Sequence, residues 1–138
     1  MEPTAILQPV TVLGLWTGVM MIWMYATRFP AAIKAGINPQ EAAHLKDFIL
    51  PSEVARIADN YNHLFEQPTL FYAIALAIAV MGHGDQTAVT CAWSIVILRV
   101  GHSLIQSTIN IVMLRLAVFT LSWIVLLIMM VREALVIF

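Results

Sequence analysis

The sequence predicts an all-α integral membrane protein, a bundle of four transmembrane helices, and two observations predict this fold class. Of the 138 residues, 61% are hydrophobic and only 11% are charged, whereas soluble domains average about 45–50% apolar and about 25% charged residues. Four apolar runs also have the length of about 20 residues that a helix needs to cross a hydrocarbon core about 30 Å thick. This composition excludes a soluble enzyme, and the length supports one domain over residues 1–138.

The four predicted spans are bounded by charged residues, glycine or proline, and cover residues 5–27, 51–81, 86–110 and 112–137. Arg28 and Pro30 are expected to end the first span, and the turn at 82–85 joins the second span to the third. Residues 28–50 form the one sizeable loop, with a turn signal in Gly-Ile-Asn-Pro at 36–39.

The basic residues predict the orientation of the bundle. Four of them lie in or beside the first loop, namely Arg28, Lys34, Lys46 and Arg56. Cytoplasmic loops carry an excess of Lys and Arg, so we expect the first loop in the cytoplasm and both termini outside, although Arg132 points the other way. The net charge of -1 offers no basic surface for nucleic acid, and membrane lipids are the expected surroundings.

The second span carries a polar stripe. At about 100° per residue, seven polar side chains fall within an arc of about 160°: Arg56, Asp59, Asn60, Asn62, His63, Glu66 and Gln67. Pro68 cannot donate a backbone hydrogen bond, so a kink is expected just beyond this stripe.

The third span carries a second polar stripe, within an arc of about 100°, which consists of Arg99, His102, Ser103, Gln106 and Asn110. In an antiparallel hairpin about the turn at 82–85, the rise per residue places Glu66 and Arg99 at the same depth. The same count places His63 level with Ser103 and Gln106, and Asn60 level with Ser107 and Asn110. The stripes are therefore expected to enclose one polar cavity that opens toward the cytoplasm.

Three other interpretations of these stripes remain open. Glu66 and Arg99 could simply neutralise each other, with the amides and hydroxyls holding the helices together, but the stripes contain more polar groups than this role requires. Ionisable groups inside a membrane also mark ion paths, so a non-catalytic protein could bind or conduct protons or ions through Glu66, Arg99 and His102. Asp59, His63 and Glu66 could share a cation, but a single helix carries all three, so no metal is expected.

The two stripes also resemble a known family. Residues 56–72 read Arg-Ile-Ala-Asp-Asn-Tyr-Asn-His-Leu-Phe-Glu-Gln-Pro-Thr-Leu-Phe-Tyr, and residues 92–103 read Ala-Trp-Ser-Ile-Val-Ile-Leu-Arg-Val-Gly-His-Ser. Both segments resemble the MAPEG family, the membrane-associated proteins in eicosanoid and glutathione metabolism. With the four-span plan, the resemblance covers nearly the whole chain. It is strongest to a bacterial branch with Ala-Asp-Asn followed by Phe-Glu-x-Pro, which implies a bacterial inner membrane.

The resemblance implies a homotrimer that binds glutathione as a co-substrate between subunits, near the cytoplasmic side. It implies that Arg56, Asn62 and Glu66 hold the charged ends of the peptide, and that Arg28 reaches a neighbouring subunit's site. Arg115 is the implied catalytic residue, since a thiol with a pKa of about 8.5 needs a nearby cation to become a thiolate at neutral pH. The expected reaction is a transferase or peroxidase reaction on a small lipophilic electrophile.

The remaining stripe residues complete the expected binding set, which adds Asn60, His63, Arg99, His102 and Gln106. The chain departs from better-known members at two places. Their Asn and Glu are three residues apart, whereas Asn62 and Glu66 are four apart and His63 occupies the intervening position that keeps the spacing of three. Their third-helix tyrosines are replaced by His102 and Gln106, and a histidine donor would be sensitive to pH near neutrality.

Overall fold

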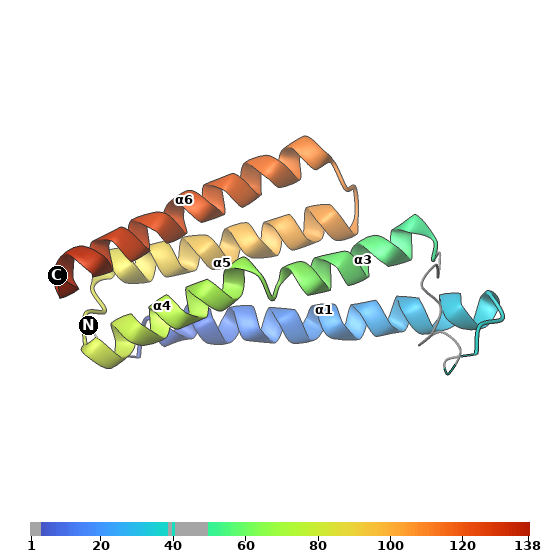
Figure 1. Cartoon of the computed structure of the whole chain (residues 1–138), viewed down its shortest axis with the longest axis horizontal. Coiled ribbons are helices and arrows are strands. Elements are labelled where there is room, and N and C mark those ends of the chain that lie inside the picture. Colours follow the sequence, from blue (N-terminus) through green and yellow to red (C-terminus); the bar gives the residue numbers. More distant parts are fainter. Residues whose placement is uncertain (1–3, 39, 41–49) are drawn as a thin grey trace.

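The computed structural model describes residues 4–38, 40 and 50–138 of the chain (Figure 1). Every regular element in these ranges is a helix: α1 (Leu7–Lys34), α3 (Ser52–His63), α4 (Gln67–Met81), α5 (Gln86–Ser107) and α6 (Val112–Ile137). Four helical segments are long and apolar enough to cross a membrane, with α3 and α4 together forming one of them. The predicted fold class is therefore confirmed.

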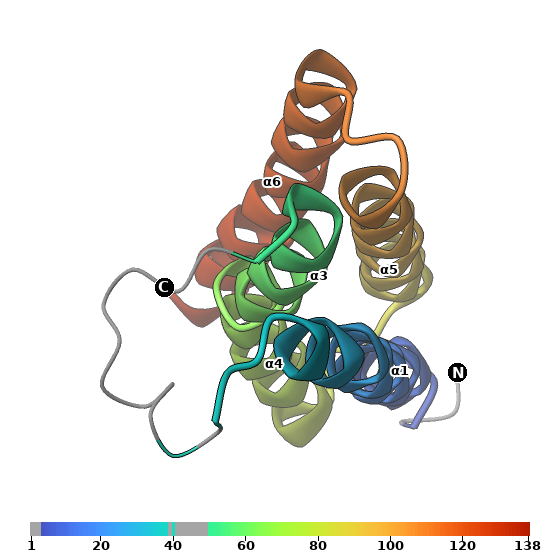
Figure 2. The same cartoon turned by 90° about the vertical axis from the view of Figure 1, so that its right-hand side faces the viewer.

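The helices run lengthwise beside one another, and successive spans are antiparallel (Figure 1). The start of α1, the α4–α5 turn and the end of α6 lie at one end of the bundle, and the α5–α6 connection lies at the other. Seen from that second end, α6 slants away from α3 and α1 (Figure 2). The bundle therefore has two distinct ends, and each carries its own group of polar residues.

The first span is longer than predicted. The expected end was at Thr27, but α1 continues through Arg28 and Pro30 to Lys34, because a proline removes only one backbone hydrogen bond from a long helix. The helix ends where Gly36 adopts a φ of 68°. The Gly36 N–H donates to the Ile33 carbonyl and the Ile37 N–H to the Ala32 carbonyl, which is the pattern of a glycine-terminated helix. The rest of the predicted loop, with Lys46, lies largely outside the described residues.

The second span is interrupted rather than kinked. Helix α3 ends at His63 and α4 begins at Gln67, so the break falls inside the polar stripe and not beyond it. Pro68 lies in the first turn of α4, where a missing N–H breaks no helical bond. The prediction of one continuous kinked helix is therefore wrong. Backbone groups in a membrane need internal partners, and the Glu66 carbonyl accepts hydrogen bonds from the Thr69 hydroxyl at 2.6 Å and from the Thr69 N–H at 3.2 Å.

The break gives the two halves of the second span one common neighbour, α1, and one different neighbour each. Helix α3 packs against α1 and α5, whereas α4 packs against α1 and α6. The larger apolar core joins α1, α4, α5 and α6 and includes Leu13, Phe71, Ile95 and Leu126. A smaller core between α1 and α3 consists of Met20, Met24, Ile57 and Leu64. The buried polar residues of α5 begin at Arg99, beyond the larger core, in the half of the bundle that α3 occupies.

Candidate functional site

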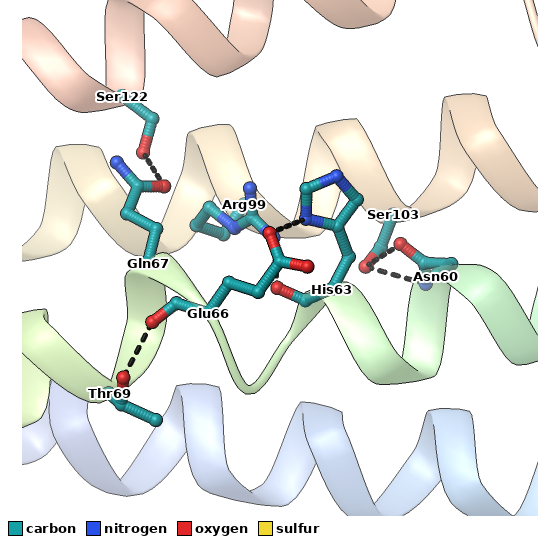
Figure 3. A network of polar contacts seen from close by, with 8 residues as sticks. All are labelled: Asn60, His63, Glu66, Gln67, Thr69, Arg99, Ser103 and Ser122. Carbon is teal, nitrogen blue, oxygen red and sulfur yellow. Dashed lines mark hydrogen bonds and ion pairs between the residues drawn. The ribbon is translucent and has the colours of Figure 1, made fainter.

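Asn60 and Ser103 connect α3 to α5 through buried side chains (Figure 3). The Asn60 amide nitrogen lies 3.0 Å from the Ser103 hydroxyl, and that hydroxyl lies 3.1 Å from the Asn60 amide oxygen. The two predicted stripes therefore do face each other. Their register differs from the predicted one by about one helical turn, because Asn60 was expected level with Ser107 and Asn110. The predicted register counted the rise per residue along two continuous helices, but the second span is not continuous, because it breaks after His63.

Arg99 is the most unusual buried residue of the site, with none of its surface exposed. Its Nη2 donates a hydrogen bond to the His63 carbonyl at 3.2 Å, and its guanidinium carbon lies 5.8 Å from the centroid of the Phe119 ring. This is a cation–π distance. Its Nε and Nη1 atoms are buried without a hydrogen-bond partner in the described part of the chain. Arg99 therefore retains donors that can bind another group.

Glu66 does not form an ion pair with Arg99, which was the structural alternative to an open cavity. Its Oε2 lies 2.9 Å from His63 Nδ1, and 65% of its side chain is exposed (Figure 3). The two groups are at ion-pair distance, but their alignment does not make a hydrogen bond, because His63 Nδ1 is without a hydrogen-bond partner. The Glu66 carboxylate is therefore not paired directly with the Arg99 guanidinium, and the interpretation of these two charges as a closed structural pair is not supported.

Further along α5, three buried polar residues follow Arg99 toward the α5–α6 connection. We refer to Arg99, His102, Gln106 and Ser107 as the polar row. His102, Gln106 and Ser107 are all buried, and each has a side-chain atom with no hydrogen-bond partner in the described residues: Nδ1, Oε1 and Oγ. Buried polar atoms are paired in about nine cases of ten in native proteins. Several unpaired atoms in one row therefore mark a place that is suited to a polar ligand.

A pocket of about 270 Å³ opens beside this row, between α3, α5 and α6. Its polar wall consists of His63, His102 and Arg115, and its apolar wall consists of Val112, Leu116 and Phe119. The rings of His63 and His102 lie 5.6 Å apart, and Phe119 packs against both. The pocket can thus receive a molecule with a polar part and an apolar part.

The predicted site residues fall into two groups. One group surrounds the pocket and the adjoining polar row: Asn60, His63, Glu66, Arg99, His102, Gln106 and Arg115. The other three lie elsewhere within the chain. Arg28 is exposed on α1, and Asn62 is exposed on α3. Arg56 is half-buried, and its Nε has no hydrogen-bond partner among the residues that the structure describes.

Two features were not anticipated: Phe119, and the contact that Gln67 of the predicted stripe makes with Ser122. The Ser122 hydroxyl donates to the Gln67 side-chain oxygen at 3.1 Å, which joins α6 to α4 between buried residues. Arg115, Phe119 and Ser122 follow one another at spacings of four and three residues, so they share one face of a helix. This spacing was the signal that could have located them.

Asp59, His63 and Glu66 are not grouped as a metal site would require. Within the described ranges, no three His, Cys, Asp or Glu side chains lie close enough to hold a metal ion. Asp59 is exposed, while His63 and Glu66 contact each other. The alternative of a cation shared by Asp59, His63 and Glu66 is therefore not supported by the structure.

A second polar group lies at the opposite end of the bundle, where the α4–α5 turn meets the end of α6. His83 Nδ1 lies 2.7 Å from Glu133 Oε1, and Arg132 Nη2 lies 2.6 Å from Asp85 Oδ2. Asp85 also caps α5 by accepting from the Ala88 N–H at 2.7 Å. The hydrogen bonds from Arg132, and then from Ala88, lower the pKa of Asp85 below its usual value. We refer to these four side chains, His83, Asp85, Arg132 and Glu133, as the turn cluster.

Comparison with known proteins agrees with the fold and the stripes. The model of the MAPEG family matches residues 6–135, and neither the curated proteins nor the solved structures contain a match. The match covers α1, α3, α4 and α5 and nearly all of α6, and it includes the pocket and the polar row. With its four helices of transmembrane length and composition, the protein is an integral multi-pass membrane protein. The chain belongs to the MAPEG family.

Proposed function

We propose that this protein is a thiol-dependent transferase or peroxidase, with glutathione or a related thiol as co-substrate and a lipophilic electrophile as the second substrate. The observation that carries the proposal is the pocket that is lined both by the polar side chains of Arg115, His63 and His102 and by apolar side chains of α6. The unpaired nitrogens of Arg99 beside it add donors that can hold a charged end of the thiol compound. Membership of the MAPEG family supports the same class of chemistry.

In the proposed reaction, Arg115 stabilises the thiolate of the bound thiol compound. A thiol with a pKa of about 8.5 is mostly protonated at neutral pH, and an adjacent cation shifts the equilibrium toward the nucleophilic thiolate, with the thiol proton released to water. The sulfur then donates an electron pair to the electrophilic carbon, a C–S bond forms, and the leaving group departs with its bonding pair. The apolar residues Val112, Leu116 and Phe119 would hold the electrophile next to the sulfur.

We further propose that the functional unit is a homotrimer in a bacterial inner membrane, with the pockets near the cytoplasmic side. Glu66 lies within a membrane span and yet most of its side chain is exposed in a single chain. A charged side chain at the centre of a membrane helix raises the free energy of membrane insertion by on the order of 2.5–3.5 kcal/mol. A neighbouring subunit would cover this carboxylate. Assembly of the trimer would also bring Arg28, Arg56 and Asn62 toward the thiol compound, as the resemblance implies.

The test uses the protein purified in detergent. Glutathione binding is measured by calorimetry, and turnover is measured with a chlorodinitrobenzene electrophile and with an organic hydroperoxide. We expect Arg115→Leu to lower kcat by about 100-fold, the size of effect seen when one group that stabilises a developing charge is removed. Arg115→Lys retains the charge but loses the planar fork, so its loss is smaller.

Lys34→Gln is the matched control, because it removes an exposed basic side chain from the end of α1. We expect it to retain the wild-type turnover. Wild-type protein that neither binds glutathione nor shows thiol-dependent turnover would overturn the proposal, and so would equal activity of the Arg115→Leu and Lys34→Gln proteins.

A second candidate function is proton binding or conduction, which is favoured by the contact series from Glu66 through His63 to His102. The larger apolar core separates this series from the opposite end of the bundle, which makes it the weaker candidate. Protein reconstituted in liposomes distinguishes the two functions. Proton flux that disappears in Glu66→Gln would favour this candidate, and the absence of flux from active protein would exclude it.

A further inference from the structure

The connection between α5 and α6 contains an unusual backbone conformation. Asn110 has a φ of 51°, and in the described ranges it is the one residue other than glycine with a positive φ. Asparagine is among the few non-glycine residues that adopt this left-handed conformation readily. The Asn110 N–H donates to the Ile105 carbonyl at 2.7 Å, which fixes the position of the residue relative to α5.

The side chain of Asn110 contacts Arg115. Arg115 Nη1 donates a hydrogen bond to Asn110 Oδ1, while Arg115 Nε has no hydrogen-bond partner in the described residues. Asn110 precedes Ile111, the N-cap of α6, and Arg115 is the fourth residue inside the helix. Side chains at these two positions meet at the start of a helix, as they do in the hydrophobic staple. The turn therefore aims the Asn110 carboxamide at the guanidinium group.

We propose that Asn110 is a positioning residue that holds the Arg115 guanidinium in the pocket and leaves its charge free to act on the thiolate. The inference rests on the function proposed above. A long arginine side chain has many rotamers, and one fixed hydrogen bond reduces the entropy that it loses when an anion binds. A neutral acceptor is suited to this role, because a carboxylate at the same place would also hold Arg115 but would offset its positive charge.

Two variants separate the side chain from the backbone. Asn110→Gly retains the left-handed conformation at no steric cost and removes the acceptor. Asn110→Asp retains an acceptor and adds a negative charge. Ile109→Gly is the matched control, because it adds a glycine to the same connection at an exposed residue and leaves Asn110 in place.

The first measurement is the thiol pKa of bound glutathione, followed as the ultraviolet absorbance of the thiolate against pH, together with kcat. In Asn110→Gly we expect this pKa to rise by about one unit, which corresponds to about tenfold less thiolate well below the pKa. In Asn110→Asp we expect a larger rise, and in Ile109→Gly a wild-type value. An unchanged thiol pKa in both Asn110 variants overturns the inference, even if the yield of folded protein falls.

The second measurement does not depend on thiol chemistry. Phenylglyoxal reacts with free guanidinium groups, and mass spectrometry of the labelled protein gives the rate at Arg115. We expect several-fold faster labelling in Asn110→Gly and slower labelling in Asn110→Asp, with Ile109→Gly unchanged. Equal rates in wild type and Asn110→Gly overturn the positioning role. If the wild type shows no thiol chemistry, the proposed function fails, and the labelling rates alone then decide whether Asn110 positions Arg115.

Discussion

The two ends of the bundle differ in whether their polar side chains are paired. In the turn cluster, His83 pairs with Glu133 and Asp85 pairs with Arg132. In the polar row near the α5–α6 connection, several buried atoms lack a hydrogen-bond partner among the described residues, including two nitrogens of Arg99. Paired charges hold helices together, whereas unpaired buried donors and acceptors cost free energy of folding. A protein retains such a cost where binding requires it, so we propose that the end with unpaired groups is a functional end and that the turn cluster is a structural end.

The largest expected effect is at Arg99, whose removal tests whether the unpaired end serves function. We expect Arg99→Met to lower kcat/KM by about 100-fold, as the loss of one preorganised charge does elsewhere. The free energy of unfolding should stay constant or rise, because the variant removes two buried nitrogens that have no partner in the described ranges. The His63 carbonyl that loses Arg99 still accepts from the Glu66 N–H. Turnover assays and thermal unfolding in detergent measure both quantities. A fall in Tm that accounts for the lost activity would mean that Arg99 is structural.

The next largest effect is at Glu133, where the comparison predicts the reverse result. Glu133→Ala leaves His83 without its buried partner, and the loss of a hydrogen bond to a charged group costs about 1.5–3 kcal/mol of the free energy of unfolding. Activity per folded molecule should stay at the wild-type level. Chemical unfolding in detergent measures the change, with Glu53→Ala at an exposed position of α3 as the control. Loss of turnover in folded Glu133→Ala protein would contradict the division into two ends.

A smaller effect is expected where the functional end contains one structural contact, the pair of Asn60 and Ser103. Hydrogen bonds between membrane helices contribute about 0.6 kcal/mol on average and reach about 1.7 kcal/mol. We expect a coupling free energy in this range between Asn60→Ala and Ser103→Ala. Unfolding of the wild type, the two single variants and the double variant gives this coupling. A coupling near zero would place Asn60 with the ligand-binding groups instead.

The smallest effect concerns the exposed pair of Asp85 and Arg132, and it depends on pH. The folded state lowers the pKa of Asp85, so the stabilisation is present above the unfolded pKa of about 3.9 and is lost as pH falls through the lower folded pKa. Exposed pairs contribute about 0.2–1 kcal/mol. Asp85→Asn retains a good helix cap. The difference in unfolding free energy between wild type and variant should therefore disappear once the pH is below the folded pKa of Asp85. A difference that persists there would assign the effect to capping.

Much of the fold could be predicted because the thickness of a bilayer sets the length of each span. Apolar runs of the required length located all four spans. The end of α1 was harder to predict, because Pro30 can either end a helix or lie inside one. Gly36 marked the true end through its left-handed conformation, and this signal was present in the predicted turn.

The candidate site could be predicted in composition but not in register. Helical periodicity showed that Asn60 and Ser103 lie on facing stripes, and this contact is present. The break at 64–66 could not be placed, because Pro68 is equally compatible with a kinked helix and with the first turn of a new one. The hydrogen-bond partner of Arg99 depends on that break, because Arg99 donates to the backbone carbonyl of His63, where α3 ends, and not to the Glu66 carboxylate.

The interruption between α3 and α4 has a consequence for how the second span meets its neighbours. A continuous helix fixes the rotation of its two halves together, whereas residues 64–66 are held by turn hydrogen bonds, such as the one from the Phe65 N–H to the Asn62 carbonyl at 3.0 Å. Both halves pack on α1, but α3 otherwise packs on α5 and α4 on α6. Each half is therefore matched to its own partner, Asn60 to Ser103 of α5 and Gln67 to Ser122 of α6.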